Sequence, residues 1–386
     1  MANVNQIYLI VNDAAKEAMG LQAISVKNTA GLVSLGEQVL SSTENTDKFY
    51  QALVDRIGRT VIAVRTYAGK KRSVKRDEMD WGIWYQKISY KKVSATSNTD
   101  WDKTSTLSKY DITPQTEAVQ NLFSKVGTFR FIDSVPQQKL YTAFTNAEAM
   151  GAFISGIYTN MDNCIAKYEE DNDNLAVATN IAIVISDGKA SQKRNLLAEY
   201  NTAHAGATLT TTNCLESLDF LKYASEQIGQ TQKYMEDLGV AFNASSDIPR
   251  HTPVEKCVVE VLSTFAKKSA FYLQSDTFHK ELVELPRYEE VSYWQGCGTD
   301  FSFGEVSKVS IQNGTLNITV GGILAFVHDV DSCASVIRKQ RAFSTYDEIN
   351  DRLVFGKNFD HGYAVDKTEN AVVFYIADVE QSGGEG

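Results

Sequence analysis

The sequence predicts an α+β protein, with two packed lobes or one lobe with large insertions, and three observations support this fold class. The chain has 386 residues, which exceeds the usual size of a single domain. Apolar residues at helical spacing begin after Thr145 and continue for a long stretch, whereas residues 308–320 alternate as paired strands do. A hydrophobic content of 43% with 22% charged residues is ordinary for a folded protein with a large core.

Composition and charge exclude several classes of protein. No apolar run approaches the roughly 20 residues that cross a bilayer, and the N-terminus lacks the basic start of a signal peptide. We therefore expect a protein made in a cytoplasm, with no membrane partner. The net charge of −10 repels nucleic acid overall.

The first 66 residues predict a weakly packed arm followed by a short core element. Residues 1–47 contain short apolar segments broken by glycines, which predicts an arm with little core of its own. Phe49, Leu53 and Ile57 follow helical spacing, and residues 60–64 favour a strand.

Residues 67–108 are basic and aromatic, and they predict an extended arm of two strands. A lone hairpin is marginally stable in water, so this arm needs support from another surface. It suits binding to single-stranded nucleic acid, a solvated loop, or docking on an acidic neighbour, and the global acidity and the large aromatics favour docking. The candidate contact residues are Lys70, Lys71, Arg72, Lys75, Arg76, Trp81, Trp84, Tyr85, Lys87, Lys91 and Lys92.

A long helix is predicted over residues 147–185. A helical pattern over 114–125 and a short strand over 128–133 come before it, and residues 145–148 have the pattern of a capping box. If the helix ends at Gly188, it has about 40 residues and a length of roughly 60 Å. Its acidic run suits a divalent cation, or a helix face that meets solvent or a partner. The run lacks the glycine and the terminal glutamate of a calcium loop, which favours the solvated or partner-facing surface. The acidic candidates are Glu169, Glu170, Asp171 and Asp173.

Beyond residue 212 the pattern predicts a second, mixed lobe. A helix is expected over 217–238, with an interruption near Gly229, and Asn313-Gly314 favours a tight type I′ hairpin. Buried strands are predicted at 256–262, 323–329 and 371–376, a helix and a strand at 275–285, a loop at 346–360, and a loose tail at 381–386. We expect the strand at 371–376 to return to the first lobe and pair with residues 60–64.

Few residues of the sequence suggest catalysis or the binding of a metal or cofactor. The sequence has no nucleophile elbow, phosphate loop, dinucleotide fingerprint or zinc-protease motif. Cys297 with His328 or His361 has the residue types of a thiol nucleophile and its base, but a flexible Gly-Cys-Gly loop is the simpler interpretation. The five cysteines include no closely spaced pair, and we expect them to be reduced and mostly buried. We expect no catalytic residue, metal or cofactor.

Several segments resemble the major capsid proteins of tailed bacteriophages, most closely those of small podophages with protein-primed genomes. They are FYQALVDRIGRTVI at 49–62, MDWG at 79–82, LYTAFT at 140–145, FGKNFDH at 355–361 and TENAVVFY at 368–375. Their order along the chain is that of the family. The resemblance implies the Hong Kong 97-type fold and a shell that encloses double-stranded DNA. Because the sequence stops at Gly386 and has no cross-linking motif, we expect neither an added decoration domain nor a lysine–asparagine cross-link.

The resemblance also implies a division of the chain. It assigns residues 1–47 to an N-terminal arm, 48–66 to the start of a peripheral domain, 67–108 to an extended loop, 109–211 to the peripheral domain with its spine helix, 212–334 to an axial domain, 335–380 to the peripheral return, and 381–386 to a tail. The implied partners are further copies in hexamers and pentamers, a scaffolding protein, a portal, and packaged DNA without sequence specificity. The implied location is the virion capsid, assembled in the bacterial cytoplasm.

Other functions are also compatible with the sequence. An encapsulin-like nanocompartment would keep the fold and enclose an enzyme in place of DNA. A cysteine-dependent hydrolase would use Cys297, and a nucleic-acid-binding protein would use the basic arm.

Overall fold

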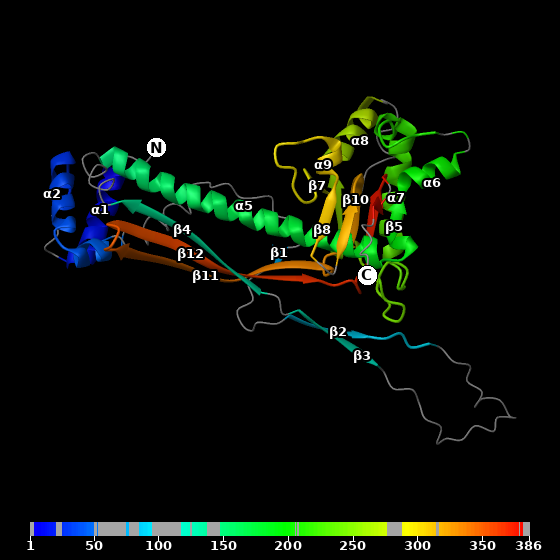
Figure 1. Ribbon diagram of the computed structural model, residues 1–386, viewed down its shortest axis with the longest axis horizontal. Helices are drawn as coiled ribbons and strands as arrows, with labels where there is room; N and C mark the ends of the chain where they lie inside the picture. The colour runs from blue at the N-terminus through cyan, green and yellow to red at the C-terminus, as the bar shows by residue number, and fades with distance from the viewer. Residues whose placement is uncertain are drawn as a thin grey trace, which may run out of the picture. The chain divides into compact units, whose positions relative to one another are not determined.

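The computed structural model of the chain describes most residues, and Figure 1 shows their helices and strands. The described residues are 4–20, 25–49, 52, 75–76, 85–94, 117–123, 126–136, 147–204, 206, 208–275, 288–313, 316–377 and 379–380. They fall into two compact units. The first comprises Met1–Lys71, Val126–Glu170 and Ile337–His361, and the second comprises Arg72–Lys125, Asp171–Val336 and Gly362–Gly386.

Two helices open the first unit, α1 (Val4–Met19) and α2 (Thr29–Leu40). The Asn12 amide donates to the carbonyl of Val26 at 2.8 Å and its Oδ1 accepts from the same residue's N–H at 2.6 Å. The prediction that residues 1–47 carry little core is wrong, because helical spacing gathers their apolar residues on buried stripes despite the glycines. The buried residues of these helices are Val11, Ala14, Ala15, Leu32, Leu35 and Val39.

Strands and the first part of a long helix complete the core of this unit. Strand β4 (Val126–Pro136) confirms and extends the strand predicted at 128–133. It neighbours β12 (Arg352–Val365), in a sheet of order β1-β11-β12-β4 that includes β1 (Lys75–Arg76) and β11 (Cys333–Asp347). The rings of Phe131 in β4 and Phe359 in β12 pack edge to face, with their centroids 5.9 Å apart.

The loop predicted over residues 346–360 is wrong. Only residues 348–351 turn between β11 and β12, and the chain is strand again from residue 352. Leu353, Phe355 and Phe359 are buried, while intervening polar residues obscure the alternation in the sequence. Lys357 among them is held by an ion pair with Asp162 at 2.7 Å.

The predicted long helix is confirmed as α5 (Ala147–Asp187), which has 41 residues and runs without a break in Figure 1. At the usual rise it is about 60 Å long. It stops at Gly188, where a Cβ would lie 2.2 Å from the carbonyl oxygen of Val184. The Lys193 ammonium donates to the carbonyl of Ile185 at 3.1 Å and so satisfies one of the terminal carbonyls.

A five-stranded sheet forms the centre of the second unit. Strand β10 (Ile323–Asp329) pairs antiparallel with β13 (Ala371–Tyr375) and with β6 (Cys257–Leu262). Strands β5 (Lys193–Asn195) and β7 (Glu289–Val291) form the edges. The strands predicted at 256–262, 323–329 and 371–376 are confirmed.

The expected pairing of the strand at 371–376 with residues 60–64 is wrong. Strand β13 has β10 on one side and β5 on the other, so both of its edges are occupied within the second unit. Its Val372, Val373 and Phe374 are fully buried there.

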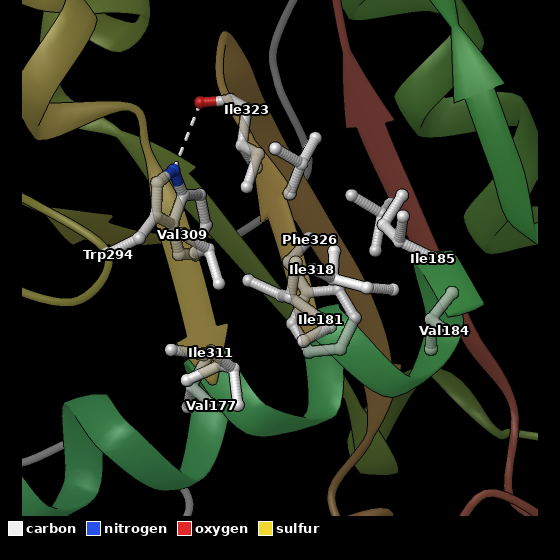
Figure 2. Packing of buried hydrophobic residues seen from close by; sticks show 14 of the residues in the cluster. Val177, Ile181, Val184, Ile185, Trp294, Val309, Ile311, Ile318, Ile323 and Phe326 are labelled. Atoms are coloured by element: carbon white, nitrogen blue, oxygen red, sulfur yellow. Dashed lines mark hydrogen bonds between the residues drawn. The ribbon is translucent and has the colours of Figure 1, made fainter. Parts of the chain in front are cut away.

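The two faces of this sheet pack on different layers. On one face, Phe326 belongs to a cluster with Val177, Ile181 and Val184 of α5, and Figure 2 shows these side chains facing one another. Trp294 closes the same cluster and donates its indole N–H to the carbonyl of Ile323 at 3.0 Å.

The opposite face is covered by three helices, α6 (Leu196–Ala203), α7 (Leu218–Met235) and α8 (Ser263–Ser275). Ala325 and Val327 of β10 cluster there with Phe220 and Phe265. The helix predicted over 217–238 is confirmed, and it continues through Gly229 without the expected interruption.

A smaller sheet contains the predicted hairpin. Strand β8 (Val309–Gln312) pairs antiparallel with β9 (Asn317–Val320), which also pairs with β14 (Val379–Glu380). The hairpin is confirmed, but the predicted two-residue turn at Asn313-Gly314 is wrong, because the register opposes Gln312 to Asn317. Residues 314 and 315 lie outside the described residues. The Asn313 side chain accepts from the N–H of Leu316 at 2.8 Å, a role that suits asparagine in turns.

Several expectations lie outside the described residues. They are most of the helix at 49–57, the strand at 60–64, the start of the capping box at 145–148, nearly all of the segment 275–285, and the tail at 381–386. Within the described part of the chain, no helix is both long and apolar enough to cross a membrane.

Candidate functional site

The predicted arm at 67–108 contributes one strand, β2 (Tyr85–Tyr90), to an antiparallel ribbon. Its partner β3 (Ala118–Phe123) lies beyond the predicted bounds of the arm, with Tyr85 opposite Phe123 and Tyr90 opposite Ala118. The helix predicted over 114–125 is therefore wrong. Apolar residues at every second or third position are compatible with both a helix and a strand. Pairing with β2 stabilises the strand.

Lys87 attaches the inward face of this ribbon to the rest of the second unit, of which the ribbon is a part. Its ammonium lies 3.0 Å from Oδ2 of Asp366 and 2.5 Å from Oε1 of Glu369. It also donates to the carbonyl of Asp331 at 3.4 Å. Only 15% of the lysine side chain is exposed, against 4% and 8% for the two carboxylates. We call Lys87, Asp366, Glu369 and Arg250 the ribbon anchor.

Arg250 supplies the second cation of the ribbon anchor. Its Nε lies 3.1 Å from Oε1 of Glu369, and its Nη2 donates to the hydroxyl of Ser89 on the ribbon at 2.6 Å. Two cations therefore face two carboxylates, and the group is neutral. Such balance is required because an unpaired buried charge is strongly destabilising.

The ionisation of the ribbon anchor follows from this balance. Burial is the largest influence on the Lys87 pKa and lowers it, but the bond to Glu369 and the attraction of both carboxylates raise the pKa above its ordinary value. Burial likewise opposes ionisation of Asp366, yet Lys87 and hydrogen bonds from Thr368 bring its pKa below the usual range. Burial raises the pKa of Glu369, which remains the weaker acid of the two.

The far end of the ribbon has its own contacts. Lys91 forms an ion pair with Glu117, and its backbone N–H donates to the Glu117 carbonyl at 2.9 Å. The N–H of Lys92 donates to the carbonyl of Asp247 at 2.6 Å. The ribbon is thus held to its own subunit at Lys87, Ser89 and Lys92.

The structure gives less information on the other predicted contact residues of the arm. Lys75, Arg76 and Tyr85 lie in strands, at positions where only the backbone is described. Lys70, Lys71, Arg72, Trp81 and Trp84 lie outside the described residues altogether.

The acidic residues at 169–173 of α5 differ in their exposure to solvent. Asp171 is exposed and Glu169 is half-buried, but Glu170 and Asp173 are buried at 8% and 3%. Glu170 lies 3.8 Å from the ammonium of Lys167. The accessible candidates of this run are therefore Glu169 and Asp171.

The sequence analysis did not identify Asp366, Glu369, Arg250 or Ser89. The only local signal was the pair of acids in Asp366-Lys-Thr-Glu369, directly before strand β13. The Asp366 backbone explains their position, because its N–H donates to the carbonyl of Ser332 at 2.8 Å and so fixes the loop beside β10. That contact depends on tertiary structure alone.

Neither imidazole suggested as a base for Cys297 is accessible, because His328 and His361 are both buried. His328 is fully buried in β10, with Nδ1 2.9 Å from the carbonyl of Asp329 and Nε2 4.0 Å from Glu260. A nitrogen so close to a carbonyl carries the proton, so Nδ1 is the donor. Among the residues that the structure describes, no three His, Cys, Asp or Glu side chains come together as a metal site.

Comparison with known proteins connects this geometry to a family. A model of the Phi29-like phage major capsid protein family matches residues 7–375. A search of curated proteins finds no match.

Two solved structures share the fold. One is described as "Structure of head fiber and inner core protein gp22 of native bacteriophage P68"; it is 10% identical with a TM-score of 0.55, covering 81% of this chain and 86% of that chain. The other, "Capsid structure of Staphylococcus phage Andhra", is 10% identical with a TM-score of 0.53, covering 82% of this chain and 86% of that chain. At this identity the likeness establishes the fold alone, and it confirms the predicted α+β capsid fold of the Hong Kong 97 type.

Proposed function

The chain belongs to the Phi29-like phage major capsid protein family, and we propose that copies of it assemble into the icosahedral shell that encloses the double-stranded DNA genome of a tailed bacteriophage. The observation that carries this proposal is the extent of the family match, which spans both compact units. The protein is a structural component of the virion capsid, and its principal partner is itself.

The proposal includes a mechanical role with no catalysis. The two imidazoles that the sequence suggested as a base for Cys297 are both buried, His328 at 0% and His361 at 3% exposure. The Nδ1 of His328 moreover lies 2.9 Å from the carbonyl oxygen of Asp329. Neither an encapsulin-like compartment nor a cysteine-dependent hydrolase is favoured by membership of a phage capsid family.

Further partners follow from the same role. A scaffolding protein would set the curvature of the shell, a portal would occupy one vertex, and DNA would lie against the inner wall without sequence-specific contacts. A net charge of −10 per subunit suits that wall, since strong attraction would hinder movement of the genome.

The subdivision of the chain is part of the proposal. Residues 1–47 would form the N-terminal arm, 67–108 the extended loop, 147–185 the spine helix, and 212–334 the axial domain. The paired strands β2 and β3 support an extended loop whose base includes residues up to 123. The basic residues beyond the ribbon anchor, Lys70, Lys71, Arg72, Lys75 and Arg76, remain candidates for contact with Glu169 and Asp171 of another subunit.

Expression with and without the neighbouring phage genes tests the function. Negative-stain microscopy is expected to show closed shells of uniform size, and nuclease-resistant DNA inside particles made with the packaging genes. Persistent monomers under all conditions would overturn the proposal. Closed shells that exclude DNA and retain an enzyme would establish the encapsulin-like alternative.

A further inference from the structure

A groove lies along helix α7 in the second unit. Its volume is about 890 Å³, and Gly229, Lys233 and Glu236, which share one face of α7, line one wall. Residues 257–259 of β6 and Tyr288 line the opposite wall. We call this space the α7 groove. Its volume is in the range of sites that bind small ligands or short peptides.

Strand β6 has an open edge in the α7 groove. On one side, β6 pairs with β10 from Cys257 to Val261. On the other side, β7 pairs only with Glu260, Val261 and Leu262. In the described part of the chain, no strand borders residues 257–259 on that second side. An open strand edge offers its backbone N–H and C=O groups to an added strand, a mode of recognition known as β-augmentation.

The two walls of the α7 groove have matching lengths. Three residues of a strand span about 10 Å, and the face of α7 from Gly229 to Glu236 also spans about 10 Å. Val259 belongs to the apolar cluster that β6 shares with α7. A strand added beside it directs every second side chain toward α7. The α7 groove therefore fits a short extended segment.

The charges of the α7 groove select a basic segment. The ammonium of Lys233 lies 2.5 Å from the carboxylate of Glu236, so these two charges balance each other. Glu255 and Glu289 also line the α7 groove and leave it with an excess of negative charge. Val254 adds an apolar side chain that is 54% exposed. Such walls suit lysine and arginine, whose apolar stems pack on apolar surface while their charged ends meet carboxylates.

We propose that the α7 groove binds an extended, basic segment of a second protein, which adds a strand to β6 at residues 257–259. The two basic strands that the structure describes in this chain are already paired, β2 with β3 and β11 with β12. Each copy of the chain also has a net charge of −10, which disfavours another copy as the source of a basic segment. The inference requires no shell and is independent of the proposed function.

Binding of a labelled peptide to the unassembled subunit tests the proposal. The probe is a fluorescein-labelled hexapeptide of alternating lysine and valine. One matched control replaces its lysines with glutamates, and the other replaces a central valine with proline, which cannot donate a backbone N–H. Fluorescence anisotropy at low salt is expected to give a Kd for the probe at least about tenfold lower than for either control.

Gly229→Leu tests the site without removing a charge. A Cβ at Gly229 has nothing within 4 Å of it, and leucine favours a helix more than glycine does, so the variant is expected to fold. Because leucine fills the α7 groove, the Kd of the probe should rise at least about tenfold. Gly156→Leu is the matched control, since Gly156 in α5 has equal space and lies outside the α7 groove, and it should bind the probe as the parent does.

Glu255→Gln with Glu289→Gln removes two charges and keeps the shape of both side chains. It is expected to raise the Kd of the probe about tenfold. No binding of the probe by the parent, equal affinity in the parent and Gly229→Leu, or equal binding of the probe and the proline peptide would overturn the proposal. Release of a second subunit by the probe, measured as a fall in mass by sedimentation, would do the same, because the α7 groove would then hold a copy of this chain.

Discussion

The ammonium of Lys87 lies 3.0 Å from the Asp366 carboxylate, which joins the ribbon to the loop before strand β13. Both groups are largely buried, and Glu369 and Arg250 complete a neutral set. A buried ion pair is stable only when all its members are present, so each member determines the position of the ribbon.

Replacing Lys87 with methionine should therefore release the ribbon. The side chain keeps its length and loses its charge, which leaves Asp366 and Glu369 with Arg250 as their remaining cation. We expect the free energy of unfolding to fall by roughly 3 kcal/mol, the lower end of the range for breaking a buried pair. Denaturant unfolding of the unassembled subunit measures the change.

Lys92→Met is the control for that substitution, because the Lys92 side chain is exposed. It is expected to change the free energy of unfolding by no more than about 0.5 kcal/mol. Equal effects of the two substitutions would show that the ribbon anchor contributes nothing beyond an ordinary surface lysine.

The free energy of unfolding is expected to depend on pH in the alkaline range because of Cys257. The thiol lines a cavity of about 890 Å³, yet burial raises its pKa to about 12 from the ordinary value of 9.0. Since the folded pKa lies above the unfolded one, the stabilisation is complete below pH 9 and is lost as the pH rises toward 12. Between pH 8 and 10, the parent should lose about 1 kcal/mol more than a Cys257→Ala variant.

Alkylation offers a separate measurement of the same group. Near pH 8, iodoacetamide should modify the exposed Cys164 of the unassembled subunit at least tenfold faster than Cys257, because the thiolate is the nucleophile. Similar rates for the two thiols, or identical pH profiles for the parent and Cys257→Ala, would contradict the raised pKa.

Gly356 is predicted to be intolerant of any side chain. A Cβ at this position of β12 would lie 2.2 Å from the carbonyl oxygen of Phe131 on the neighbouring strand β4. Gly356→Ala forces the two strands apart and is expected to cost about 3 kcal/mol of unfolding free energy or more.

Gly321→Ala is the matched control, because a Cβ at that position would have nothing within 4 Å of it. It is expected to leave the thermal midpoint within about 2 °C of the parent. Comparable losses in both variants would mean that the effect comes from chain entropy and not from the close approach of β4.

Ile181 and Leu175 allow the packing of α5 to be tested within one helix. Ile181 is fully buried against Phe326, whereas Leu175 is 43% exposed. Ile181→Ala should lower the free energy of unfolding by about 3 kcal/mol and Leu175→Ala by about 1 kcal/mol. An equal loss at both positions would place α5 outside the core of the second unit.

The elements that the sequence predicted correctly carry strong local patterns. The apolar stripe of α5 repeats over many turns, and β10 is an unbroken buried run between turn residues. The capsid family was also accessible from the sequence, because the similar segments keep their order along the chain and the family match spans residues 7–375.

Three of the incorrect predictions share one physical cause. Strands β3 and β12 are exposed on one side, so their apolar residues are diluted by polar ones, and α2 contains two glycines. The local preference for helix or strand is weak at such positions. Pairing with distant strands or burial against α5 therefore decides which secondary structure forms. The same holds for the ribbon anchor, whose cations Lys87 and Arg250 are far in the sequence from the carboxylates of Asp366 and Glu369.

The sequence by itself determined the α+β class, the long helix, the central strands and the family, because each depends on patterns that neighbouring residues complete. Only the tertiary structure decided that Lys87 is neutralised within its own subunit, and that the ribbon turns Ile88 and Tyr90 outward. The physical reason is that the electrostatic interactions of a charge depend mainly on the groups within a few ångströms of it. For Lys87 those groups are Asp366 and Glu369, which lie far away in the sequence.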